Sequence, residues 1–94
     1  MKFSQFDAAE YLEDEETIAF YLNDALESGD TQQLLQALQT VAKARGMSQL
    51  AKDTGLGRES LYKTLSGKTK PRFETIYKIS KAMGVDIQFK PISN

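Results

Sequence analysis

Apolar side chains recur along most of this chain at every third or fourth position, which is the spacing of one face of an α-helix. The pattern predicts five helices. Each is followed at once by a glycine, the residue type that most readily ends a helix. We expect the helices over residues 15–28, 31–45, 48–54, 58–66 and 73–83.

Polar residues at the helix starts support these boundaries. Asp14, Asp30 and Ser48 stand where an N-cap residue accepts a hydrogen bond from a backbone amide. Gln33 follows Asp30 at the spacing of a capping box. The inward face of the first helix is expected to carry Ile18, Tyr21, Leu22, Ala25 and Leu26. That of the last helix is expected to carry Phe73, Ile76, Tyr77, Ser80 and Met83, with Ile79 alongside.

The period changes after residue 84. Val85, Ile87 and Phe89 alternate with polar residues, which is the spacing of a short β-strand. A lone strand is not stable, so it must pair with a second copy of the chain or with another protein. The predicted fold is all-α, with five helices, an N-terminal arm over residues 1–13 and this short C-terminal strand.

Charge divides the chain into two unlike halves. Residues 1–40 carry nine acidic side chains and one basic one, a net of −8. Residues 41–94 carry eleven basic and four acidic ones, a net of +7. Two partners of opposite charge are expected from such a division. We therefore separate an acidic arm and helix, residues 1–30, from a second unit, residues 31–94.

Composition excludes several classes of protein. The chain has no Cys and no His, which rules out disulfides, thiolate zinc sites and thiol nucleophiles and removes the commonest general base. We expect no cofactor, no metal and no enzymatic activity. No apolar run is long enough for a membrane span, and the first residues lack the apolar core of a signal peptide. The expected compartment is the cytoplasm, and a binding module is the leading class.

The segment with most functional information is residues 50–63, where two short helices meet at a glycine turn. Small Ala51 allows close approach of the helices, and Gly55 permits a left-handed turn. Leu50, Leu56 and Leu61 are expected to face inward and to hold the pair together. This is the spacing of a helix-turn-helix, although an ordinary helical hairpin has similar features.

Basic residues favour the DNA-binding interpretation. Arg58 and Lys63 lie on the outer face of the second motif helix, where they could reach guanine in the major groove. Glu59 could accept from a cytosine amino group, and Tyr62 could contact a thymine methyl or a phosphate. The loop that follows supplies sequence-independent phosphate contacts. The side chains expected at DNA are Arg58, Glu59, Ser60, Tyr62, Lys63, Lys68, Lys70 and Arg72.

Residues 46–89 resemble the Xre/Cro-type DNA-binding domain of phage repressors, a lambda-repressor-like fold. The matching positions are Leu50-Ala51, Gly55-Leu56, Leu61, residues 67–73 and Met83-Gly84-Val85. Many such domains use a Gln at the start of the first motif helix to contact phosphate. The resemblance therefore adds Ser48 and Gln49 to the expected DNA contacts.

Nearly the whole chain is similar to the addiction-module antidote proteins, the antitoxins of type II toxin–antitoxin pairs. The segments that carry this similarity are Tyr11-Leu12 and residues 15–23, 44–51, 61–63 and 71–73. The resemblance implies a small basic toxin of the RelE/ParE fold as partner. The acidic N-terminal region has the charge expected of a surface that binds a basic toxin, because acids steer a basic partner and aromatics supply buried anchors.

Phe3, Phe6, Tyr11 and Phe20 are the candidate toxin contacts. Alternatively, these aromatics pack the first helix onto the helix-turn-helix. A domain this small needs a dimer to bind DNA specifically, and we expect a homodimer through Val85, Ile87, Phe89 and part of the last helix. The strand could instead extend the sheet of the toxin.

The sequence thus predicts an antitoxin that represses its own operon as a DNA-bound dimer and neutralises a toxin. The alternative is a stand-alone Cro/Xre-type repressor with no protein partner, although such a repressor gains little from an acidic arm.

Overall fold

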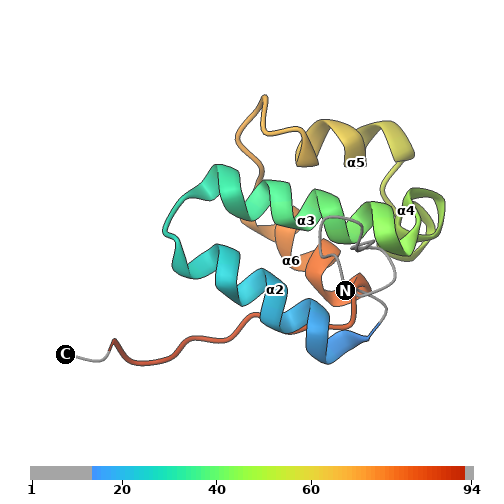
Figure 1. Cartoon of the computed structure of the whole chain (residues 1–94). Helices are drawn as coiled ribbons and strands as arrows, with labels where there is room; N and C mark the ends of the chain where they lie inside the picture. Colours follow the sequence, from blue (N-terminus) through green and yellow to red (C-terminus); the bar gives the residue numbers. More distant parts are fainter. Residues whose placement is uncertain (1–13, 93–94) are drawn as a thin grey trace, which may run out of the picture.

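The computed structural model describes residues 14–92, and these form five α-helices (Figure 1). The helices are α2 (Glu15–Glu27), α3 (Thr31–Arg45), α4 (Met47–Thr54), α5 (Arg58–Leu65) and α6 (Phe73–Ala82). The all-α prediction and the five helices are confirmed, with boundaries that differ by one residue at most.

Two of the three predicted N-caps are present. Asp14 accepts hydrogen bonds from the Glu16 amide (3.1 Å) and the Thr17 hydroxyl (2.8 Å), and Asp30 accepts one from the Gln32 amide (3.0 Å). The third prediction was wrong, because α4 begins one residue before Ser48, at Met47. The N-cap position there belongs to a glycine, which makes no side-chain hydrogen bond.

Helix α3 lies at the centre of the fold and contacts α2, α4 and α5, and α4 contacts both α5 and α6 (Figure 1). One apolar core joins all five helices. Its largest fully buried side chains are Ile18, Leu38, Val41, Leu50, Leu61, Ile79 and Met83. Burial of each such side chain contributes about 1.5–3 kcal/mol, so the core fixes the position of every helix, including the two of the motif.

The inward face predicted for α6 was wrong in part. Ile79, Ser80 and Met83 are buried, whereas Phe73 and Tyr77 are 65% and 41% exposed. These two rings stack on each other, with centroids 6.1 Å apart. The helix has apolar residues around much of its circumference, and packing against α4 selects the side that carries Ile79.

The first helix also buries less than predicted. Ile18 and Leu22 are in the core, but Leu26 near the end of α2 is 52% exposed. The last turn of α2 therefore presents an apolar side chain to the surface.

The predicted C-terminal β-strand is absent from the described residues, in which 85–92 have no regular secondary structure. A strand needs a hydrogen-bonding neighbour, and the single chain offers none to this segment. Val85 and Ile87 are half-buried, and Phe89 is 97% exposed. The segment follows α2 from its first turn to its last turn, where Lys90 pairs with Glu27 at 3.7 Å (Figure 1).

Candidate nucleic-acid interface

Helices α4 and α5 and the short turn between them occupy the residues for which a helix-turn-helix was predicted. Leu50 and Leu61 are buried, and Leu56 and Ala51 are half-buried against the same core. Gly55 ends α4 with a φ of +76°, a left-handed conformation that glycine adopts at little cost. The core therefore holds α5 against the rest of the domain while its other side faces solvent.

Thr54 supports this turn in a way that sequence reasoning missed. The side chain is buried, and its hydroxyl donates a hydrogen bond to the Leu50 carbonyl at 2.9 Å. The same oxygen accepts from the Leu56 amide at 3.2 Å. A Thr at the last position of a helix can bond both backward and forward in this manner, which was the available sequence signal. One hydroxyl thus joins the end of α4 to the turn.

All of the side chains predicted to contact DNA are exposed. They are Ser48, Gln49, Arg58, Glu59, Ser60, Tyr62, Lys63, Lys68, Lys70 and Arg72. They come from the first turn of α4, from α5 and from the loop before α6, which are consecutive parts of the motif. Their exposure permits DNA contact, but the individual roles remain predictions.

Interactions within this surface orient several of these groups. The Arg58 guanidinium lies over the Tyr62 ring, 5.9 Å from its centroid, so the aromatic side chain supports the cation on the outer face of α5. Gln49 donates to the Asp53 carboxylate at 2.9 Å, which directs its side chain along α4. Both are contacts between residues one helical turn apart.

Two local hydrogen bonds of the Ser66 side chain connect the end of α5 to the basic loop. The Ser66 hydroxyl donates to the Lys63 carbonyl at 2.8 Å and accepts from the Lys68 amide at 3.3 Å. Arg72 lies 4.0 Å from Glu74, an exposed pair that contributes little to stability. Among residues 14–92 no ion pair involves Lys68 or Lys70, and both side chains are exposed.

The opposite charge lies on α2. Glu16, Asp24 and Glu27 are exposed, and Phe20 on the same helix is 74% exposed. Phe20 is therefore not packed into the core, and its contact with a toxin stays a prediction. Phe3, Phe6 and Tyr11 lie outside the described residues.

The described residues contain no cluster of three metal-ligating side chains of the kinds His, Cys, Asp or Glu. Within the same residues, no helix is long and apolar enough to span a membrane.

Comparisons with known proteins identify the family. A family model described as "Probable addiction module antidote protein" matches residues 2–91, nearly the whole chain. This chain belongs to that family of antidote proteins. A related protein of Haemophilus influenzae, named only as uncharacterized, is 47% identical over 83 residues, which cover 88% of this chain and 86% of the relative. No solved structure shows a significant match.

Membership places the chain among antitoxins of toxin–antitoxin systems, as the sequence resemblance predicted. An antidote protein implies a cognate toxin as its partner, and the family is generally non-enzymatic. The antidote protein described here has two exposed surfaces of opposite charge, one on the helix-turn-helix and one on α2.

Proposed function

We propose that this antidote protein binds operator DNA as a dimer, represses its own operon and neutralises a small basic toxin of the RelE/ParE type. The observation that carries the DNA part is the exposure of a run of basic and polar side chains along α4, α5 and the loop before α6. In the usual docking of this motif, the second helix enters the major groove and the flanking segments lie on phosphates.

On this proposal α5 reads bases and the loop positions the domain. Arg58 and Lys63 reach guanine edges in the major groove of the DNA. The Tyr62 ring, which lies beside the Arg58 guanidinium, orients that side chain toward the bases. Lys68 and Lys70 contact phosphates, as does Arg72 after release from Glu74. Ser48 and Gln49 contact the backbone at the first turn of α4.

Dimerisation uses the C-terminal segment and the exposed side of α6. Phe89 is almost wholly exposed, and the Phe73–Tyr77 stack lies on the surface of α6. Val85 and Ile87 are half-buried against their own helices, so they contribute mainly backbone groups to a second copy. If two chains paired through this segment, their backbone amides and carbonyls would form the β-sheet hydrogen bonds that this segment lacks in a single chain.

Toxin binding uses the acidic N-terminal region. Phe20 is an exposed aromatic among exposed acids on α2, a combination that suits a basic partner with an apolar pocket. Phe3, Phe6 and Tyr11, which lie outside the described residues, are the other proposed toxin contacts.

Two measurements test the proposal with the full chain. Co-expression with the product of a small basic reading frame next to the gene should restore growth and give a stable complex, and Phe20→Ser should weaken that complex. Gel shift of a duplex from the chain's own upstream region should show sequence-specific binding that Arg58→Ala weakens.

Lys43→Gln is the control for folding and charge, because Lys43 is exposed on α3 outside the motif. Specific DNA binding without any toxin complex would instead support a stand-alone repressor. Toxin binding without sequence-specific DNA binding would refute the repressor part of the proposal.

A further inference from the structure

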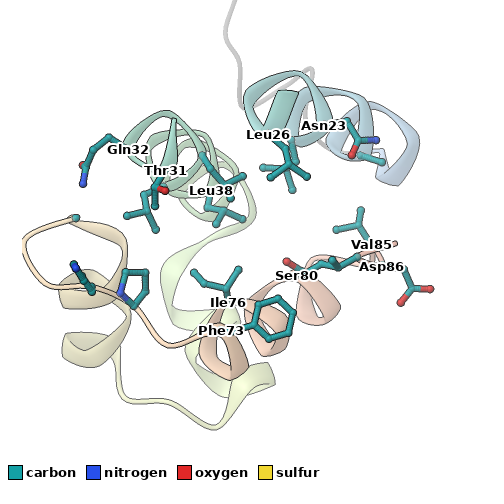
Figure 2. A pocket seen from close by; sticks show the side chains of 18 of the residues that line it. Asn23, Leu26, Thr31, Gln32, Leu38, Phe73, Ile76, Ser80, Val85 and Asp86 are labelled. Atoms are coloured by element: carbon teal, nitrogen blue, oxygen red, sulfur yellow. The ribbon is translucent and has the colours of Figure 1, made fainter. Parts of the chain in front are cut away.

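A large apolar groove lies on the side of the domain away from α4. It has a volume of about 790 Å³ and is bounded by α2 and α3 on one side and by α6 and residues 85–88 on the other (Figure 2). Leu26 and Leu38 face Ile76 and Val85 across the opening (Figure 2). This is the size of pocket that encloses several large side chains.

The groove ends at the loop proposed to contact DNA. Gly67 lies so close to α3 that a Cβ placed on it would be 2.6 Å from the Gln32 side-chain oxygen. Lys68 and Lys70 follow directly and form part of the groove wall. An occupant of the groove therefore lies beside two of the proposed phosphate contacts.

The charge at the rim selects an acidic occupant. On one side are the two lysines, which have no ion pair among residues 14–92. On the other side the carboxylate of Asp86 is already paired with Lys81 at 2.6 Å. The charge left for an occupant is positive, which disfavours a basic toxin and favours an acidic apolar segment.

We infer that the chain's own residues 1–13 fold back into this groove. The segment contains Phe3, Phe6 and Tyr11 followed by Leu12, and it carries three acids, Asp7, Glu10 and Glu13, against one base, Lys2. It thus combines side chains that fill an apolar groove with a net negative charge, and Asp7 and Glu10 are far enough along the chain from Asp14 to reach the two lysines at the rim.

The geometry allows this segment to reach the groove. It joins α2 at Asp14, and the α2 residues that line the groove extend as far as Leu26. That distance is about 18 Å along the helix, whereas 13 extended residues span up to about 43 Å. Because the segment is tethered, its effective concentration at the groove is in the millimolar range, which a second chain would not match at low protein concentration.

The docked arm competes with DNA for Lys68 and Lys70. A toxin that takes Phe3, Phe6 and Tyr11 withdraws the arm from the groove, releases both lysines and strengthens DNA binding. This consequence rests on the proposed function, whereas the docking itself depends only on the groove and the arm.

Paramagnetic relaxation in the full chain tests the docking without DNA or toxin. The absence of cysteine allows a single spin label at Ser4→Cys. Amide signals of Leu26, Gly67 and Ile76 should lose more than half their intensity, while those of Gln49 and Asp53 on α4 should not. Adding Phe3→Ser and Phe6→Ser should restore the groove signals.

The matched control is Phe20→Ser, which removes an exposed ring from α2 outside the groove and should leave the effect unchanged. Retained groove signals in the labelled wild-type background would overturn the inference. A sample that mixes spin-labelled chains with isotope-labelled ones would also overturn it if the groove signals broadened there, because the occupant would then be a second copy.

A second measurement tests the competition with DNA. The double variant Asp7→Asn and Glu10→Gln should bind a non-specific duplex at least about threefold more tightly at low salt. One phosphate contact changes affinity by that factor over a fourfold change in salt. If the amide signals of the groove broadened but the DNA affinity of the variant did not change, the arm would not cover Lys68 and Lys70.

Discussion

The loop lysines provide the most quantitative test of the proposed DNA interface. Replacing Lys68 and Lys70 with Gln removes two exposed ammonium groups that no acid in residues 14–92 neutralises. Both are proposed to contact phosphates, and each contact contributes about 0.9 to the slope of log affinity against log salt. A dimer loses four such contacts, so the slope should become less steep by about 3.6.

The effect on affinity follows from that slope. Between 50 and 200 mM salt, the wild-type dimer should lose about 150-fold more affinity than the double variant. Sequence preference should not change, because phosphate contacts carry no base information. Fluorescence anisotropy of a labelled operator duplex at three or more salt concentrations measures both quantities.

A charge-matched control separates contact from long-range attraction. Lys43→Gln with Lys52→Gln removes the same charge from α3 and α4, at two exposed side chains that are not among the proposed DNA contacts. The control should keep the wild-type salt slope. Equal slopes for the loop variant and the wild type, or an equal change in the control, would refute the assignment of Lys68 and Lys70 to phosphates.

Three further predictions concern the fold that holds the interface. Thr54→Val should lower the free energy of unfolding by about 1–3 kcal/mol in urea denaturation, because it leaves buried backbone groups of the turn without a partner, and Thr54→Ser should restore most of the loss. Gly84→Ala should be more destabilising in the same assay than Gly29→Ala, since both glycines have a positive φ but only at Gly84 would the new Cβ meet a neighbour, at 2.7 Å; equal losses would contradict this. The hydrogen bond from the Thr17 hydroxyl is the main cause that lowers the pKa of Asp14 below 3.8, and the hydrogen bond from the Glu16 amide adds to it. The stabilisation by the ionised Asp14 carboxylate is therefore fully present above pH 3.8. It is lost as the pH falls through the lowered pKa. The stability difference between wild type and Thr17→Val should therefore be constant near neutral pH and shrink below pH 3.8, and a difference that grows on acidification would refute the assignment.

The helices and the exposed motif surface could be predicted from the sequence because the signals are local. A glycine after each apolar run and an Asp before two of them fix the helix ends through backbone conformation and capping alone. The exposure of Arg58 and Lys63 follows from their positions relative to buried Leu61 on the same short helix. The division of charge between the two halves and the family resemblance likewise depend only on the amino-acid sequence.

Features that depend on a neighbour could not be predicted in this way. Several residues of α6 are apolar, and only packing against α4 decided that Ile79 is buried while Phe73 is exposed. The alternation at residues 85–90 has the period of a strand, but a strand forms only where another strand supplies its hydrogen bonds. The apolar groove likewise arises from the separation of α2 and α6, which no local sequence pattern specifies, because the distance between two helices is set by everything that packs between them.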